Sequence, residues 1–181
     1  TLQELGESYG LIGQLHRLWI QPGSPLAGQT VAEAGLRSRY GVTLVGVERQ
    51  RPFGDKVASA LATTELRPAD VLYLVGPAEA VETFGAAERL TPLSIQDSQQ
   101  RTLVQELGMV EVLLPPDSDL IGQTLRSAAF RNRHGLSVLG IRRRSRPLPG
   151  NLIEEKLAFG DVLLVAGSWK QIGRLQGDRK H

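Results

Sequence analysis

Arginine side chains are the residues of this sequence whose type and spacing could do chemistry. Arg37 and Arg39 precede a glycine, and the same spacing returns as Arg131 and Arg133 later in the chain. Guanidinium groups are planar, fork-shaped donors that suit phosphate and carboxylate groups. We therefore predict a site for a small anion, and its candidate residues are Arg131, Arg133, His134, Arg142, Arg144, Arg37 and Arg39.

A structural interpretation of the same arginines stays open. Cations near the C-terminal end of a helix interact favourably with the helix dipole, by a few tenths of a kcal/mol to about 1 kcal/mol. Charged side chains on a surface are also normally solvated. Binding of nucleic acid is not expected, because aromatic side chains are not interleaved with the arginines and no helix-turn-helix pattern is evident.

Charge is unevenly distributed along the chain. The formal net charge is only +2, so the whole chain gives no argument for a nucleic-acid or membrane surface. Between Leu125 and Pro147, however, the arginines are accompanied by no carboxylate. The first half has Glu33 and Glu48 at positions where the second half has other residues, Ser127 and Arg142. Because a carboxylate repels a nearby anion, we expect an anion to bind the arginines of the second half.

The stretch Gly23–Thr30 comes close to a phosphate-binding loop. It fits G-x-x-x-x-G-K-T except that Gln29 replaces the lysine that contacts the phosphates. In the second half Asp117 also replaces the first glycine. We therefore interpret this stretch as the entry to a helix, and a phosphoryl-group enzyme built on this degenerate loop is the weakest hypothesis.

Other catalytic and metal-binding patterns are missing from the sequence. There is no G-x-S-x-G, no cysteine and no H-E-x-x-H, and the three histidines share no metal-ligand spacing. Asp70 and Asp161 each precede an apolar stretch, where a carboxylate commonly accepts hydrogen bonds from the amides of a turn. We predict a protein that is not an enzyme and that needs no cofactor and no metal.

An internal repeat organises the chain. Residues 22–50 begin PGSPLAGQT and residues 116–144 begin PDSDLIGQT, and about a dozen of roughly 29 aligned positions are identical. A second pair of similar segments, residues 69–76 and 160–167, closes each copy. The chain is therefore one small module used twice.

Each copy resembles the TrkA C-terminal domain, also called the regulator-of-potassium-conductance (RCK) C-terminal domain. The resemblance rests on the order of an opening strand, gSpL-x-GkT, R-x-R-x-G, an apolar strand and a closing GDxLLvxG. Gln29 and Gln123 depart from the usual lysine, and Ala69 departs from the usual glycine. Two such domains in tandem resemble the cytosolic insert of bacterial sodium/sulfate-type permeases. Some members similar to this chain bind purine nucleotides, including cyclic di-adenosine monophosphate.

The expected fold class is α+β, with two small, mostly antiparallel sheets covered by short helices and related by a pseudo-two-fold axis. We expect a leader at 1–14, a first domain at 15–89, a connector at 90–108, a second domain at 109–176 and a tail at 177–181. Domains this small bury only about 60% of their unfolded surface, so the two should pack together. Candidate interface residues are Phe84 and Trp169, and Thr30 and Glu33 predict a helix capping box.

The resemblance implies a regulatory, ligand-sensing region of an ion or anion transporter at the cytoplasmic face of the inner membrane. Its expected partners are transmembrane permease segments, a small anionic or nucleotide ligand, and a second copy in a homodimer. No stretch of this sequence is itself apolar enough to span a bilayer. The alternative is an assembly module that holds permease protomers together without a ligand.

Overall fold

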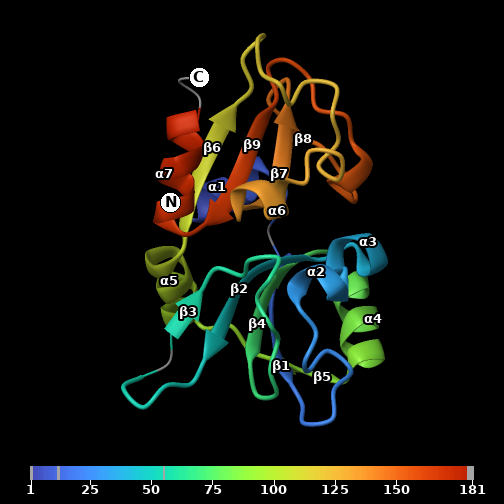
Figure 1. Ribbon diagram of the computed structural model, residues 1–181, viewed down its shortest axis with the longest axis vertical. Coiled ribbons are helices and arrows are strands. Elements are labelled where there is room, and N and C mark those ends of the chain that lie inside the picture. Colours follow the sequence, from blue (N-terminus) through green and yellow to red (C-terminus); the bar gives the residue numbers. More distant parts are fainter. Residues whose placement is uncertain (1, 12, 55, 179–181) are drawn as a thin grey trace.

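The computed structural model describes residues 2–11, 13–54 and 56–178, which form two stacked lobes with one antiparallel sheet each (Figure 1). The first repeat contains β1 (Leu15–Ile20), α2 (Val31–Ala34), α3 (Leu36–Tyr40), β2 (Thr43–Arg49), β3 (Lys56–Ala58), β4 (Val71–Val75), α4 (Ala78–Glu88) and β5 (Leu90–Leu93). The second repeat contains β6 (Gly108–Leu113), α6 (Phe130–His134), β7 (Ser137–Arg143), β8 (Arg146–Pro147), the 3-10 turn η1 (Leu152–Glu154), β9 (Val162–Gly167) and α7 (Trp169–Asp178). Two further helices, α1 (Leu2–Ser8) and α5 (Asp97–Glu106), precede the two repeats.

The predicted α+β class is confirmed. The strand orders are β3-β2-β4-β1-β5 and β6-β9-β7-β8, so the second sheet repeats the β1, β2 and β4 arrangement of the first. Side chains alternate between the two faces of each strand. In β4, Leu72 and Leu74 enter the core beneath the helices of the first repeat, while Tyr73 faces the other repeat. Each sheet therefore has its own helices on one face and the other repeat on the opposite face.

The capping box predicted for the first helix is confirmed, and a glycine interrupts the helix that it begins. Thr30 and Glu33 form the capping box, and Gly41 ends the segment in the left-handed conformation with φ 72°. Gly35, with φ 55°, divides this segment into α2 and α3. In the corresponding segment of the second repeat only α6 is helical, and it ends at Gly135 with φ 67°.

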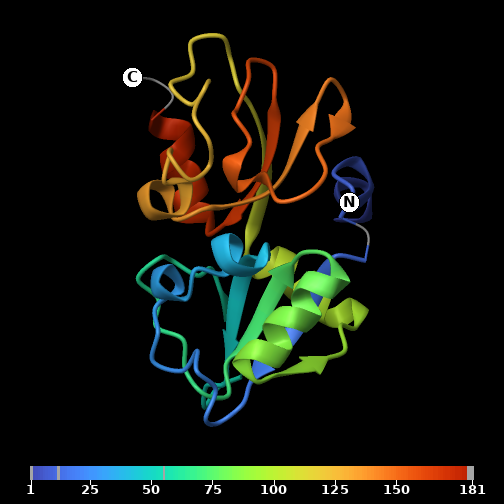
Figure 2. The ribbon, with the colours of Figure 1, turned by 90° about the vertical axis from the view of Figure 1, so that its right-hand side faces the viewer.

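The segments expected to be a leader and a connector contain structure that the sequence did not predict. β5 adds an edge strand beside β1, and α5 packs between β3 and β6. Tyr9, which follows α1, is only 3% exposed and lies in the core between the two sheets. Figure 2 shows α1 beside the second repeat, although it precedes the first repeat in the sequence.

The two repeats pack through equivalent surfaces, with β2 against β7. Each of these strands has a β-bulge at the same place in the repeat, at Val45 and at Leu139, and both side chains enter the shared core. The predicted interface residues Phe84 and Trp169 are wrong. Phe84 is 0% exposed within the core of the first repeat and Trp169 is 57% exposed, because the closing helices lie on the outer faces of the sheets.

A glycine follows the bulge in each strand, and its lack of a side chain lets neighbouring segments pack closely against the strand. A Cβ atom on Gly46 would lie 2.8 Å from Leu107 Cδ1, at the end of α5, and 3.2 Å from the carbonyl oxygen of Ala58. A Cβ atom on Gly140 would lie 3.1 Å from Tyr9 Cδ1. Each glycine thus accommodates the chain segment that precedes the other repeat.

We predict that Gly46→Ala lowers the free energy of unfolding by about 1–3 kcal/mol, because it overpacks the contact with Leu107 and Ala58. Urea denaturation measures this change. The control is Gly173→Ala in α7, where an added Cβ meets no atom within 4 Å. Alanine there should be neutral or stabilising by about 0.5–1 kcal/mol, because it is the better helix former. Equal effects of the two substitutions would contradict the close approach.

Candidate anion-binding site between the two repeats

Arg37 and Arg131 cross the boundary between the repeats in opposite directions. Arg37, on α3, donates to Thr43 Oγ1 of its own repeat and to the carbonyl oxygen of Val138 in the other. Arg131, on α6, donates to Ser137 Oγ of its own repeat, and to the carbonyl oxygen of Leu44 at 2.6 Å. The repeat alignment relates Thr43 to Ser137 and Leu44 to Val138. The interface is therefore reciprocal, as the expected pseudo-two-fold axis requires.

The two guanidinium groups are partly buried and have no carboxylate partner among the described residues. Desolvation, followed by the charge of Arg131, lowers the pKa of Arg37 to about 10. Desolvation also lowers the pKa of Arg131 to about 10. Both groups remain protonated at neutral pH, so two like charges face neutral oxygens. An anion placed between them would relieve this unfavourable electrostatic energy.

A cleft of about 250 Å³ opens at these arginines. Its polar lining consists of Arg37, Ser38, Thr43, Arg131, Asn132 and Ser137. Arg37 Nη1 has no hydrogen-bond partner among the described residues, and no unpartnered side-chain nitrogen is fully buried there. Nη1 is thus a donor that can bind a ligand.

Comparison with known proteins agrees with this tandem arrangement. Residues 15–87 and 109–177 each match the TrkA-C domain family. The chain belongs to this family. An uncharacterized transporter of Escherichia coli K12, YfbS, is 38% identical over 97% of this chain and 29% of its own length. A probable sodium/sulfate cotransporter 3 of Chlamydomonas reinhardtii is 28% identical over 81% of this chain and 18% of its own length. The chain thus spans less than a third of these curated relatives.

Among solved structures, the GsuK RCK domain covers 92% of this chain and 63% of its own, with 14% identity and a TM-score of 0.37. The RCK_C domain dimer of S. agalactiae BusR, in complex with c-di-AMP, covers 42% of this chain and 96% of its own, with 14% identity and a TM-score of 0.36. The family assignment rests on the sequence matches, since both TM-scores are low. Within the described residues, no helix of this TrkA-C tandem has the length and apolar character needed to cross a bilayer.

The remaining predicted arginines lie apart from the cleft. Arg39 donates to the Glu88 carboxylate at 3.3 Å, and Arg133 and His134 line a different hollow. Arg142 Nη2 lies 3.8 Å from Glu111 Oε1. Its guanidinium carbon is also 5.5 Å from the centre of the Tyr9 ring. Arg144 is exposed in the turn between β7 and β8. Of the seven candidates, the structure therefore places only Arg37 and Arg131 at the cleft.

Two carboxylates, which we expected to repel an anion from the first repeat, already accept hydrogen bonds within that repeat. Glu33 accepts the amide of Thr30 in the capping box. Glu48 accepts Arg17 Nη2 at 2.8 Å on the inner face of the sheet. Sequence reasoning also missed Thr43 and Ser137, although a hydroxyl residue six positions after Arg37 and Arg131 was a visible signal.

Asp70 and Asp161 confirm the turn interpretation and extend it. Each accepts a turn amide, that of Arg67 and that of Ala158. Each also binds an arginine, Arg49 in the first TrkA-C domain and Arg143 in the second. Arg143 donates to both carboxylate oxygens of Asp161, and these hydrogen bonds raise the pKa of Arg143. Both pairs have a structural role, and neither faces the cleft.

Asp161→Asn should lower the free energy of unfolding by about 2–3 kcal/mol, since the carboxylate is 0% exposed and pairs with a cation. Arg142→Gln removes a longer and more exposed ion pair, and we expect a loss below about 1 kcal/mol. Urea denaturation of both variants at neutral pH gives the comparison. A larger loss from Arg142→Gln would contradict this assignment of roles.

Proposed function

We propose that this chain is the cytosolic regulatory region of a membrane anion transporter and that it has no catalytic activity of its own. Its cleft senses a small oxyanion, held by Arg37 and Arg131. The observation that carries the proposal is the pair of desolvated guanidinium groups at the boundary of the repeats, where no described carboxylate neutralises them. Fork-shaped donors of this kind suit an oxyanion better than a single ammonium group would.

The transporter context is supported by the relatives, which include proteins named as transporters and as sodium/sulfate cotransporters. We place the chain at the cytoplasmic face of the inner membrane, with permease segments of the same or a partner chain as its partner. Sulfate is the first oxyanion to test, because a regulatory region that binds the transported ion could adjust transport to supply.

The volume of the cleft favours a small anion over a purine nucleotide as the ligand. About 250 Å³ is smaller than the roughly 300–1,000 Å³ typical of sites for drug-sized ligands. A sulfate-sized anion therefore fits the cleft as it stands. A purine nucleotide such as cyclic di-adenosine monophosphate, which the family resemblance suggests, would require the repeats to move apart.

Such a site could transmit a signal because it lies between two bodies. A ligand shifts a conformational equilibrium only if it binds one arrangement better than the other. An anion that bridges Arg37 and Arg131 binds best when both side chains point toward each other. Occupancy would therefore stabilise this relative placement of the repeats, and the attached permease segments would respond to it.

An assembly module without a ligand is the alternative function. It is favoured by the hydrogen bonds that Arg37 and Arg131 already make across the interface, which hold the repeats together without an anion. In that case a second copy in a homodimer, rather than a small molecule, would be the functional partner.

Thermal unfolding with added sulfate, phosphate, cyclic di-adenosine monophosphate and adenine nucleotides tests the proposal. A ligand at 100 times its dissociation constant stabilises by about 2.7 kcal/mol. This corresponds to roughly 2–4 °C for a chain of this size. Sulfate also stabilises proteins in general through exclusion from their surfaces, so the decisive comparison is between variants at matched ionic strength.

Arg37→Gln should remove most of the sulfate-specific shift, measured against chloride. The control is Arg146→Gln, which changes an exposed arginine on β8 and should keep the full shift. Equal shifts in all three proteins, or none with any anion, would favour the assembly module. Turnover of an adenine nucleotide would contradict the absence of catalysis.

A further inference from the structure

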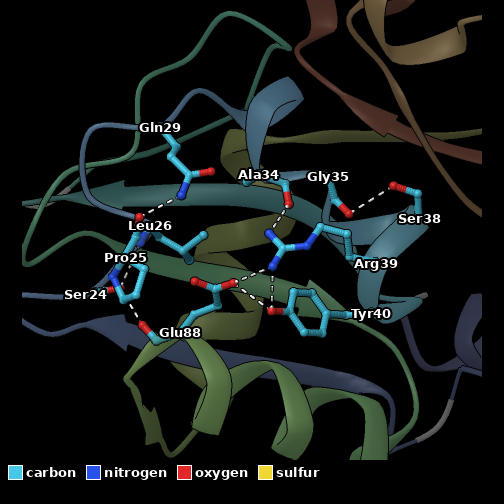
Figure 3. Close-up of polar contacts among 10 residues, drawn as sticks. All are labelled: Ser24, Pro25, Leu26, Gln29, Ala34, Gly35, Ser38, Arg39, Tyr40 and Glu88. Atoms are coloured by element: carbon cyan, nitrogen blue, oxygen red, sulfur yellow. Dashed lines mark hydrogen bonds and ion pairs between the residues drawn. The ribbon is translucent and has the colours of Figure 1, made fainter.

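In the first repeat, a carboxylate from α4 occupies a site formed by the loop after β1 and by α3 (Figure 3). Glu88 is 4% exposed, and its Oε1 accepts Tyr40 Oη at 2.7 Å and Arg39 Nη2 at 3.3 Å. Ser24 donates its hydroxyl to the backbone carbonyl oxygen of the same glutamate. Phe84, one turn earlier on α4, packs on Tyr40 with ring centroids 5.1 Å apart. The site thus holds one carboxylate and one aromatic ring.

The second repeat keeps the donors of this site and lacks its carboxylate. Ser24, Arg39 and Tyr40 correspond to Ser118, Arg133 and His134. The residue that corresponds to Glu88 is Arg179, which lies outside the described residues. Leu175 corresponds to Phe84, so a smaller side chain takes the place of the ring.

A hollow of about 450 Å³ stands at this position. Its apolar wall includes Val112, Leu114, Phe130 and Leu175. The Arg133 side chain makes no hydrogen bond or ion pair with the described part of the chain. The Ser118 hydroxyl there only accepts the amide of Leu120. Arg133 and Ser118, the counterparts of two of the three residues that bind Glu88 in the first repeat, therefore have donors to spare.

We propose that this hollow binds a small monocarboxylate with an apolar body. The ligand carboxylate accepts from Arg133, as the Glu88 carboxylate accepts from Arg39 in the first repeat, and the Ser118 hydroxyl is a further donor in the hollow. Its body fills the space that Phe84 fills there. Asp117 and Asp119 also line the hollow and repel additional negative charge, which excludes nucleotides and other polyanions.

This site is separate from the cleft at Arg37 and Arg131, and the inference does not rest on the proposed oxyanion sensing. The two are tested with different ligands and different variants. Loss of the sulfate response would leave this site unaffected, and loss of carboxylate binding would leave the cleft unaffected.

The test is an NMR titration of the full 181-residue chain with 3-phenylpropionate, a carboxylate with an aromatic body. We expect saturable changes of amide resonances around Gln123 and His134. Arg133→Gln should weaken the affinity about tenfold, since a charge-assisted hydrogen bond is lost. Replacing the ligand by 3-phenylpropionamide, which has the same shape without the charge, should weaken it similarly.

Two matched variants guard against indirect effects. Arg39→Gln changes the equivalent residue of the first repeat, which already binds Glu88, and should leave the affinity unchanged. Leu175→Phe restores the ring of the first repeat and should abolish binding while the protein stays folded. The proposal is overturned if the amide binds as tightly as the acid, if Arg133→Gln has no effect, or if Arg39→Gln weakens binding equally.

Discussion

The reciprocal crossing of Arg37 and Arg131 is the interaction on which the arrangement of the two repeats depends. Each guanidinium group spans from its own hydroxyl partner to a backbone carbonyl of the other repeat. Those carbonyls lie directly before the β-bulges, where the regular ladder of hydrogen bonds is disrupted and an acceptor can serve another donor. Each small sheet buries little surface by itself, and these hydrogen bonds fix how the two sheets pack against each other. Because the acceptors are neutral, the interface keeps the positive charge of Arg37 and Arg131.

The symmetry between the repeats is broken where α1 docks. On the inner face of the first sheet, Arg17 of β1 pairs with Glu48 of β2 at 2.8 Å. At the corresponding positions of the second sheet the signs are exchanged, with Glu111 on β6 and Arg142 on β7 at 3.8 Å. A tyrosine hydroxyl binds the glutamate in both cases, but it comes from β4 in the first repeat and from Tyr9, after α1, in the second. Charge and shape therefore distinguish two surfaces that duplication made alike.

The outer faces have diverged in a comparable way. In the first repeat the closing helix supplies Glu88 and Phe84, which neutralise Arg39 and fill the space beside it. In the second repeat the same backbone surrounds a hollow whose Arg133 has no carboxylate partner among the described residues. One copy of a duplicated module can thus be stabilised by its own side chains while the other keeps equivalent donors for a ligand. The cleft between the repeats and the hollow in the second repeat would then respond to different anions.

The sequence alone determined the features that depend on neighbouring residues. The repeat, the apolar strands, the capping box of Thr30 with Glu33, the left-handed Gly41 and the turn role of Asp70 follow from spacing and local hydrogen bonding. The fold class followed from these elements, and the arginines were visible as a repeated pattern, whose role in binding an anion stays a prediction.

Only the tertiary structure decided which partners the arginine side chains contact. Arg37 and Arg131 lie about a hundred residues from the carbonyls that they reach across the interface. Arg39 and Arg133 occupy equivalent positions in their repeats, yet among the described residues only Arg39 meets a carboxylate. β5 and α5 likewise became evident through contacts with β1 and β3, not through their own composition. A long cationic side chain can reach many partners, and which one it meets depends on how the sheets and helices pack, because local spacing carries no information about residues so distant in the chain.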